Sequence, residues 1–263
     1  RQYINGLMYL VTEEPGHRPY IIDDRNFYLP AGVRKWARKG FLNKEIKLTL
    51  GLIGTFRSET EALLLLQNAM LVTEAMGLGG WIHATMAPPF MLGHPMFKDR
   101  LNGKGLGVTY AVPRFGLFDI LRWGTFLPKV RANPVGFRDL IRCMCPPNHR
   151  NMSEAVDALV EMKYGASGTY SDRAYFARIY KGTFGDQYVK TVPKFTTETI
   201  RCVKDICNYI YDTHGRFPAH HDAIYVPGVW LQAHHLDTEY YDFLFNSGYG
   251  DTHRHHQRHW HGA

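Results

Sequence analysis

Histidines gathered in one part of the sequence are the residues best suited to chemistry. Ten of the fourteen histidines fall in the last fifty residues. Two doublets, His220–His221 and His234–His235, precede a closing run with five more, namely His253, His255, His256, His259 and His261. Imidazole is the commonest protein metal ligand, and its ordinary pKa lies between pH 5 and 8. This density points to metal binding, proton transfer or a basic contact surface.

The two doublets and a neighbouring carboxylate form a candidate metal site. Proline at position 218 favours an extended or looped stretch for His220 and His221. A helix predicted over residues 227–245 would carry His234, His235 and Glu239. On a helix, His235 and Glu239 share a face because they are four residues apart. Loop histidines together with a helical histidine and carboxylate are a suitable ligand set for zinc or non-haem iron.

A simpler interpretation of these residues stays open. A histidine on that helix could form a hydrogen bond with Asp237 or Glu239, and the sequence contains no His-Glu-x-x-His motif. In the closing run, Arg254 and Arg258 alternate with the histidines, and cations disfavour binding of a metal dication. The closing run is therefore interpreted as a basic surface that contacts solvent or a partner.

The composition is that of a globular protein with a basic balance. The 263 residues carry a net charge of +7 with histidine neutral, which suits an anionic ligand, a nucleotide-like cofactor or an acidic partner. Nucleic acid is not the expected partner, because no nucleic-acid-binding motif is present. Four cysteines are too few for a disulfide scaffold, and no apolar run reaches the roughly 18–20 residues of a membrane span. These features predict a cytoplasmic protein without a membrane span.

The hydrophobic patterns predict an α+β fold that is mainly helical with a small β-sheet. The clearest helix covers residues 59–76, with Ser58 as its cap and Gly77 and Gly79 after its end. Apolar residues lie on almost every face of this helix, which predicts that it is buried at the centre of the core. Other predicted elements are a hairpin from residues 3–11 and 19–23, a strand over 105–112, and helices over 153–164, 198–213 and 227–245.

A break in the pattern at Cys145–His149 suggests how the chain is divided. It separates an α+β core over residues 1–145 from a helical, histidine-rich part over residues 146–263, and both can belong to the same domain. The sequence begins at Arg1 without methionine or a signal peptide, which fits a chain whose true N-terminus lies further upstream.

One stretch is similar to a known family. Residues 65–81 read LLQNAMLVTEAMGLGGW, and this resembles the core helix and following Gly-Leu-Gly turn of the nitroreductase-like flavoproteins. The similarity continues in order through Met91–Pro95 and the strand at 105–112, so it covers about residues 45–115. That family's N-terminal Arg-x-Ser-x-Arg phosphate-binding motif is absent from this sequence.

The resemblance implies an FMN-dependent oxidoreductase with a nitroreductase-like core. Hydride would pass between the flavin and a small electron-poor substrate. The implied cofactor-binding residues lie in the helix and the loop after it: Gln67, Asn68, Gly77, Gly79, Gly80 and Trp81. The alternatives are a metal-dependent enzyme, with its site in residues 220–239, and a non-catalytic subunit of a larger assembly. A homo-oligomer or a subunit of a complex is expected in each case.

Overall fold

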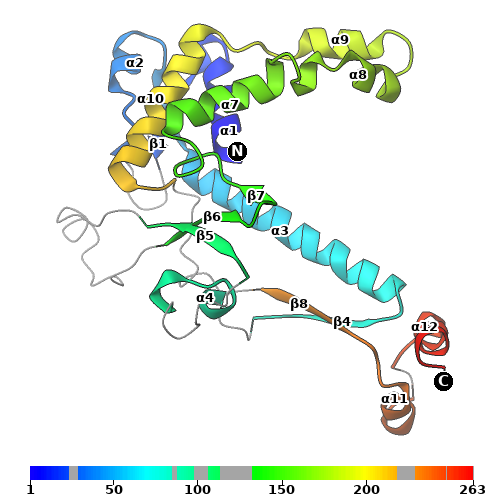
Figure 1. Cartoon of the computed structure of the whole chain (residues 1–263). Coiled ribbons are helices and arrows are strands. Elements are labelled where there is room, and N and C mark those ends of the chain that lie inside the picture. Colours follow the sequence, from blue (N-terminus) through cyan, green and yellow to red (C-terminus); the bar gives the residue numbers. More distant parts are fainter. Residues whose placement is uncertain are drawn as a thin grey trace.

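The structure, a computed structural model, describes residues 1–23, 29–84, 88–97, 106–112, 132–217, 229–246 and 248–262 (Figure 1). It is an α+β fold, 55% helical with small sheets, which confirms the predicted fold class at that level. Figure 1 shows a helical body, one long helix that leaves this body, and a small part that contains α11 and α12 at the far end of the long helix.

Three helices form the helical body: α1 (Gln2–Thr12), α7 (Met152–Tyr164) and α10 (Thr197–His214). Their apolar side chains share one core, and each helix contributes residues at helical spacing. The fully buried members are Ile4, Leu7, Met8 and Val11 from α1, Met152, Ala155, Val156 and Leu159 from α7, and Cys202, Val203, Ile206, Cys207 and Ile210 from α10. This core contains side chains from both sides of the Cys145–His149 segment.

The predicted helices at 153–164 and 198–213 are confirmed, and local signals explain their ends. The side chain of Asn151 accepts a hydrogen bond from the Glu154 backbone N–H, so it caps α7. Thr196 caps α10 in the same way, by accepting from the Thr199 N–H. The last turn of α10 ends at Gly215, whose φ of 65° is in the left-handed region.

The predicted N-terminal hairpin is wrong. Its first arm is α1, because Ile4, Leu7, Met8 and Val11 follow the helical period and fill the core. Its second arm is a strand, β1 (Pro19–Asp23), which lies between β2 (Leu29–Pro30) and β3 (Asn43–Thr49). The pairing of β1 with β3 is parallel, and the short helix α2 (Arg34–Arg38) lies in their connection.

A second small sheet contains β5 (Val108–Ala111), β6 (Asn133–Phe137) and β7 (Ile141–Arg142), so the predicted strand at 105–112 is confirmed over its described part. Short helical turns occur at α4 (Pro88–Met91), η1 (Pro15–His17) and η2 (Pro95–Phe97). After α7, the turn η3 (Thr169–Ser171) leads to the helices α8 (Arg173–Ile179) and α9 (Phe184–Thr191), which project from the helical body (Figure 1).

The long helix is α3 (Leu50–Ala75), and it differs from the prediction in two ways. It begins well before residue 59, and Ser58 is not its cap, because the Ser58 hydroxyl donates to the Gly54 carbonyl inside the helix. It is also not buried at the centre of the core. Leu50 is buried at its start, but Leu63, Leu64 and Leu65 are 60–70% exposed. Apolar residues on almost every side of a helix indicate that the helix is buried against something. They do not indicate whether this chain or another molecule buries it.

The chain turns back after α3 as β4 (Gly79–His83), which pairs antiparallel with β8 (Trp230–His234). The helices α11 (Thr238–Leu244) and α12 (Asp251–His261) follow β8. The predicted helix over 227–245 is therefore wrong, because its middle is a strand held by the ladder to β4. In the described part of the chain, no helix has the length and apolar character needed to cross a membrane.

Ile206→Ala in α10 should lower the free energy of unfolding by about 2–5 kcal/mol, because the side chain is fully buried among the three body helices. Urea denaturation with an unchanged m-value measures this loss. The matched control is Ile179→Ala in α8, where the side chain is 54% exposed. It should cost about 0.5 kcal/mol or less. Equal losses would contradict this placement of the core.

Candidate metal centre

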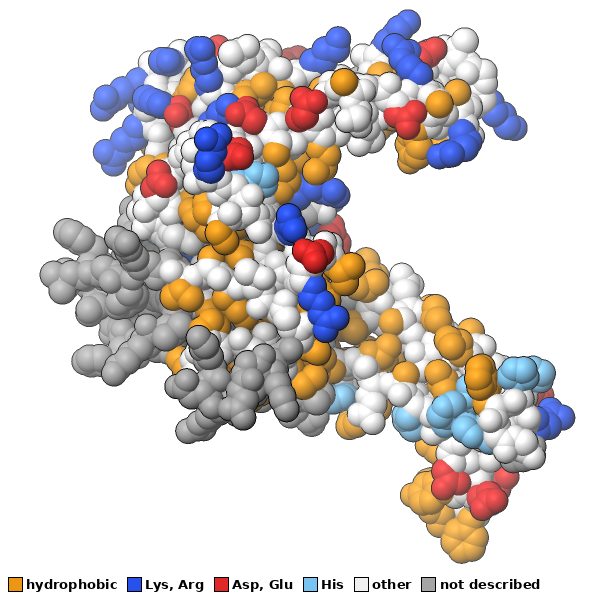
Figure 2. Space-filling view, viewed as in Figure 1, with side chains coloured by type: hydrophobic (Ala, Val, Ile, Leu, Met, Phe, Trp, Pro, Cys, Tyr) orange, Lys and Arg blue, Asp and Glu red, His pale blue; other side chains and the backbone are white. Residues whose placement is uncertain are grey.

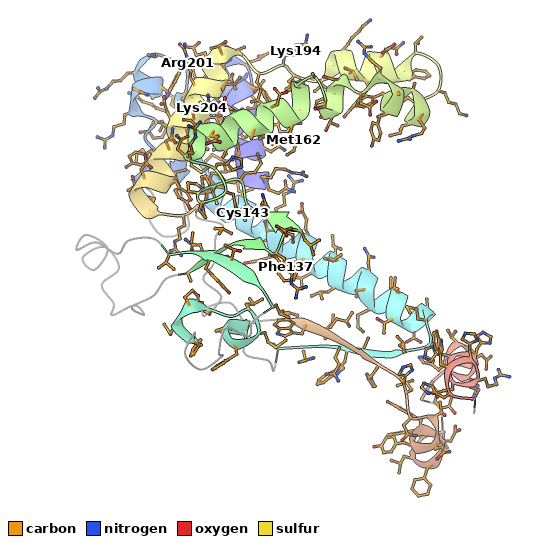
Figure 3. All side chains as sticks on the ribbon, viewed as in Figure 1. Phe137, Cys143, Met162, Lys194, Arg201 and Lys204 are labelled. Atoms are coloured by element: carbon orange, nitrogen blue, oxygen red, sulfur yellow. The ribbon has the colours of Figure 1, made fainter. Side chains whose placement is uncertain are left out.

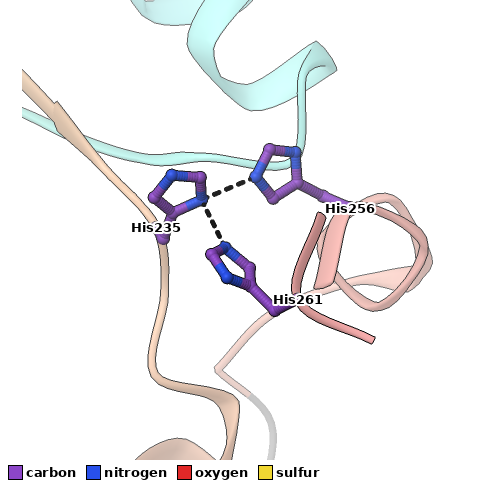
Figure 4. A group of neighbouring side chains, drawn as sticks. All are labelled: His235, His256 and His261. Carbon is purple, nitrogen blue, oxygen red and sulfur yellow. Dashed lines mark hydrogen bonds between the residues drawn. The ribbon is translucent and has the colours of Figure 1, made fainter. Parts of the chain in front are cut away.

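Three histidine rings meet at the far end of α3. His235 follows β8, while His256 and His261 come from α12 (Figure 4). One ring nitrogen from each lies within 4.8 Å of the others. The distance from His235 Nδ1 to His256 Nε2 is 2.8 Å, and that from His235 Nδ1 to His261 Nε2 is 3.0 Å. The three side chains therefore direct nitrogen atoms at one small volume.

Two glycines in the turn after α3 pack closely against the C-terminal part of the chain, and one of them lies against α12. Gly77 has a φ of +73°, and a Cβ there would lie 2.5 Å from the Thr252 carbonyl oxygen and 2.6 Å from His256 Cβ. A Cβ on Gly79 would lie 2.4 Å from a Leu236 methyl group. At Gly77 the neighbour is backbone, so glycine is required for the turn to approach α12 this closely, whereas at Gly79 the neighbours are the ends of the Leu236 and His234 side chains.

Polar contacts fix α12 further. The Gln257 amide donates to the Leu236 carbonyl, which ties α12 to the residue next to His235. His253 is 4% exposed, and its Nδ1 accepts from the Gly250 N–H at 3.1 Å. Its Nε2 lies 3.6 Å from a Glu74 carboxylate oxygen at the end of α3. Both nitrogens of His253 have partners, so this ring positions α12 and does not belong to the group of three.

Within the group of three, one nitrogen, His235 Nδ1, is close to two possible hydrogen-bond partners. A neutral imidazole nitrogen carries either one hydrogen or one lone pair. His235 Nδ1 has two close nitrogen neighbours, so it can form a well-directed hydrogen bond with only one of them. A cation at the centre could instead accept a lone pair from all three rings. In a tetrahedral zinc site with Zn–N bonds of 2.0–2.1 Å, the nitrogens are about 3.3 Å apart, close to the two separations here.

The group lies at the molecular surface, where Figure 2 shows a gathering of histidine side chains near α12. His256 is 7% exposed, whereas His235 and His261 are exposed. The nearby cation Arg254 is paired with Asp251 at 2.8 Å. This pairing reduces the repulsion that the arginines of the closing run would exert on a bound dication.

Only part of the predicted metal site is brought together. Of the five residues, His235 belongs to the group. His234 lies at the end of β8 with its ring against Gly79, and Glu239 lies in the first turn of α11, outside the group. The expected pairing of His235 with Glu239 is wrong because no helix joins them. His220 and His221 lie outside the described residues.

Asp237, the other carboxylate considered beside the second doublet, caps α11. Its side chain accepts from the Tyr240 N–H at 3.0 Å. The sequence did not indicate His256 and His261 as metal ligands. They are five residues apart, which corresponds to about 140° around a helix, so they do not lie on the same face. The density of histidine in residues 253–261 was the available signal.

Comparisons with protein-family models, with curated proteins and with solved structures found no match.

The residues implied as a flavin site form the far half of α3 and the turn after it. Gln67 and Asn68 lie on the surface of α3, and Trp81 is 48% exposed on β4, where its ring stacks on that of His83 at 4.5 Å. A Cβ on Gly80 would lie 2.9 Å from Thr73, so this glycine allows β4 to approach α3. The glycines of the loop thus serve packing within the chain.

A pair of thiols lies apart from the histidines. Cys143, which is labelled in Figure 3, and Cys145 flank one residue before the turn into α7, and both are free cysteines. A hydrogen bond from Cys145 lowers the pKa of the Cys143 thiol, and the same bond together with burial raises the pKa of Cys145. Cys143 is thus the thiol that is more readily deprotonated. Cys202 is inert by comparison, because burial raises the pKa of its thiol to about 12.

Gly77→Ala should destabilise the protein more than the same change at Gly40. Both glycines are left-handed, with φ of +73° and +72°, but only at Gly77 would an added Cβ meet neighbours within 4 Å. Gly40→Ala therefore measures the backbone strain alone, about 1–2 kcal/mol. The excess at Gly77, about 1–3 kcal/mol of overpacking, should appear in urea denaturation. Equal losses at the two positions would show that α12 does not approach the turn.

Proposed function

We propose that this chain binds a divalent zinc ion through His235, His256 and His261. The observation that carries the proposal is the convergence of three imidazole nitrogens within 4.8 Å from two separate elements. The close packing of Gly77 and Gly79 against α12 and β8 supports it, because it holds the two elements in a fixed relation.

Zinc is favoured over iron by the type of donor. Three imidazoles suit zinc, whereas non-haem iron sites of the facial type use two histidines and a carboxylate. Among the described residues, the group contains no carboxylate. A three-histidine set leaves the fourth tetrahedral position for water or another exchangeable ligand. When bound, such an ion supplies Lewis acidity and a water that ionises near neutral pH, so hydrolysis or hydration is the reaction class that this site suits.

The flavin-dependent oxidoreductase stays a second hypothesis, and it rests on the sequence resemblance. It predicts yellow protein that releases FMN on denaturation. The zinc proposal predicts colourless protein, so one ultraviolet–visible spectrum of the purified chain distinguishes the two.

We also propose that the chain forms a homodimer through α3 and β4. Leu63, Leu64 and Leu65 are consecutive and exposed, so apolar surface extends over about 200° of the helix. Exposed apolar side chains continue along both elements, at Ile53, Phe56, Leu71, Val72, Met76, Trp81 and Ile82. A contiguous patch of this kind marks an interaction surface. A second copy fits best, because a two-fold axis lets one self-complementary patch cover another.

Alanine at each of the three metal ligands should weaken metal binding. His235→Ala, His256→Ala and His261→Ala should each lower the affinity for Zn²⁺ by roughly 100-fold or more, beyond the 10–100-fold typical of a residue that only orients a ligand. Titration with Co²⁺ and competition with Zn²⁺ measure this through visible d–d absorption. Zinc at 100 times its Kd should also raise the free energy of unfolding by about 2.7 kcal/mol.

His255→Ala is the matched control, because His255 lies on the same helix but outside the group, with its ring stacked on His259 at 6.4 Å. It should leave zinc affinity within about twofold of the wild-type value. Equal losses for His255→Ala and His256→Ala would refute the assignment, as would wild-type protein that binds no zinc.

Leu64→Glu should convert the dimer to monomer. A carboxylate buried at the interface without a partner should weaken association by about 100-fold or more, as analytical ultracentrifugation would show. The control is Leu140→Glu in the turn between β6 and β7, where the side chain is 77% exposed and belongs to neither α3 nor β4. Wild-type protein that sediments as a monomer would contradict the dimer. If Leu140→Glu weakened association as much as Leu64→Glu, the choice of α3 and β4 as the interface would be contradicted.

A further inference from the structure

A cavity of about 540 Å³ lies where α7, η3, α8 and α9 meet. It is distant in the fold from the three-histidine group, since it opens beside the projecting helices at the other end of the molecule (Figures 1 and 2). Its volume is in the range of cavities that hold small organic ligands, about 300–1,000 Å³. A smaller neighbouring cavity of about 170 Å³, lined by Lys163 and Tyr170 among others, falls below that range.

Aromatic rings form one wall of the larger cavity. Tyr164 stacks on Tyr170, with ring centroids 5.5 Å apart, and meets Phe195 edge-on at 5.3 Å. Val189 and Val192 line the cavity from α9 and the residue after it. The wall is therefore largely apolar, and the cavity is open to solvent on one side. Such a wall favours a flat or bulky apolar group.

The charged side chains of the cavity are cations. Among its described lining residues, these are Arg173 and Lys194. Arg173 forms an ion pair with Asp186 of α9, so most of its charge is already compensated. Lys194 is exposed and lies between α9 and α10, where Figure 3 labels it, and among the described residues its charge has no such partner beside the apolar wall.

The hydroxyl groups of the wall are committed to the protein and stay neutral. The Tyr164 hydroxyl donates to the Pro193 carbonyl. Burial and a hydrogen bond with Tyr9 raise the pKa of Tyr170, so this phenol adds no negative charge to the cavity. The Ser171 hydroxyl donates to the Gly165 carbonyl at 2.7 Å. Lys163 also lies near this wall, with its Nζ 5.3 Å from the centre of the Phe195 ring, but its ammonium donates to the Tyr9 hydroxyl and it does not line the cavity. Among the described lining residues, the uncompensated charge is thus that of Lys194.

We propose that this cavity binds an organic carboxylate with an aromatic or otherwise apolar body. The body would lie against Tyr164, Tyr170 and Phe195, and the carboxylate would pair with the Lys194 ammonium. A cavity with an apolar wall and one uncompensated charge that fixes orientation matches the usual design of a small-molecule site.

The test uses 2-naphthoate and its neutral analogue 2-naphthalenemethanol as probes, with the whole wild-type chain. For a ligand of this size we expect 2-naphthoate to bind with a Kd of about 1 mM. Chemical-shift changes in nuclear magnetic resonance spectra, or calorimetry, would measure this binding. The neutral analogue should bind about 5–30-fold more weakly, because it lacks the charge-assisted contact. Lys194→Gln should weaken 2-naphthoate binding by the same factor and leave the neutral analogue unchanged.

Two further variants test whether the probes bind in this cavity. Lys190→Gln removes an exposed lysine of α9 that does not line the cavity, and it should change the Kd by about twofold or less. Val189→Trp should fill the cavity and weaken both probes by about tenfold or more. Equal affinity for the two probes, equal effects of Lys194→Gln and Lys190→Gln, or no binding of 2-naphthoate by wild-type protein would each overturn the proposal.

Discussion

The close approach of α12 to the turn after α3 is the contact on which the C-terminal part of the structure depends. Gly77 allows this approach, since a Cβ there would overlap Thr252 and His256 of α12, and Gly79 lies against Leu236 and His234. Thr73 is buried at the same place, and Glu74 faces His253 across it. The turn also starts β4, which provides the ladder for β8. One tight turn therefore determines where α12, β8 and the three histidines lie.

The helix α3 connects this region to the helical body, and its composition sets it apart from an ordinary surface helix. Its 26 residues correspond to about 39 Å. Leu50 is anchored in the body, and the far end is held by the Gly77 turn. Between these ends the leucines face outward on several sides. Exposure of these apolar side chains to water is unfavourable in a monomer. Because the leucines are not buried in the core of this chain, their burial against another molecule can stabilise an assembly.

Elements whose limits depend on local signals could be predicted from the sequence. The caps Asn151 and Gly215 lie next to the helices that they end, and α7 and α10 were predicted closely. The strand β8 was mistaken for helix, because its partner β4 is distant in the sequence and no local pattern reports that pairing. The burial of α3 was predicted wrongly for a related reason. Its apolar pattern specifies contact with some surface without specifying which.

The candidate site shows the same division between local and distant information. The concentration of histidine indicated metal chemistry, but the choice of ligands followed an assumed helix and therefore favoured His234 and Glu239. The observed group joins His235 to His256 and His261 through the docking of α12, which is tertiary structure. Spacing along one helix could not reveal this, because the two α12 histidines point toward a third that lies outside the helix.

The pairing of Gly79 with His234 has a consequence for the order of folding. These residues are more than half the chain apart, and the loop between them must close before β8 has a ladder. Contacts of such long range form late and slowly compared with helices such as α7 and α10. The three histidines lie within residues 235–261, on one side of this loop, so an ion held by them would join the end of β8 to α12 and would not itself close the loop. The docking of α12 against the Gly77 turn is the contact that ties the histidine group to the other side of the loop.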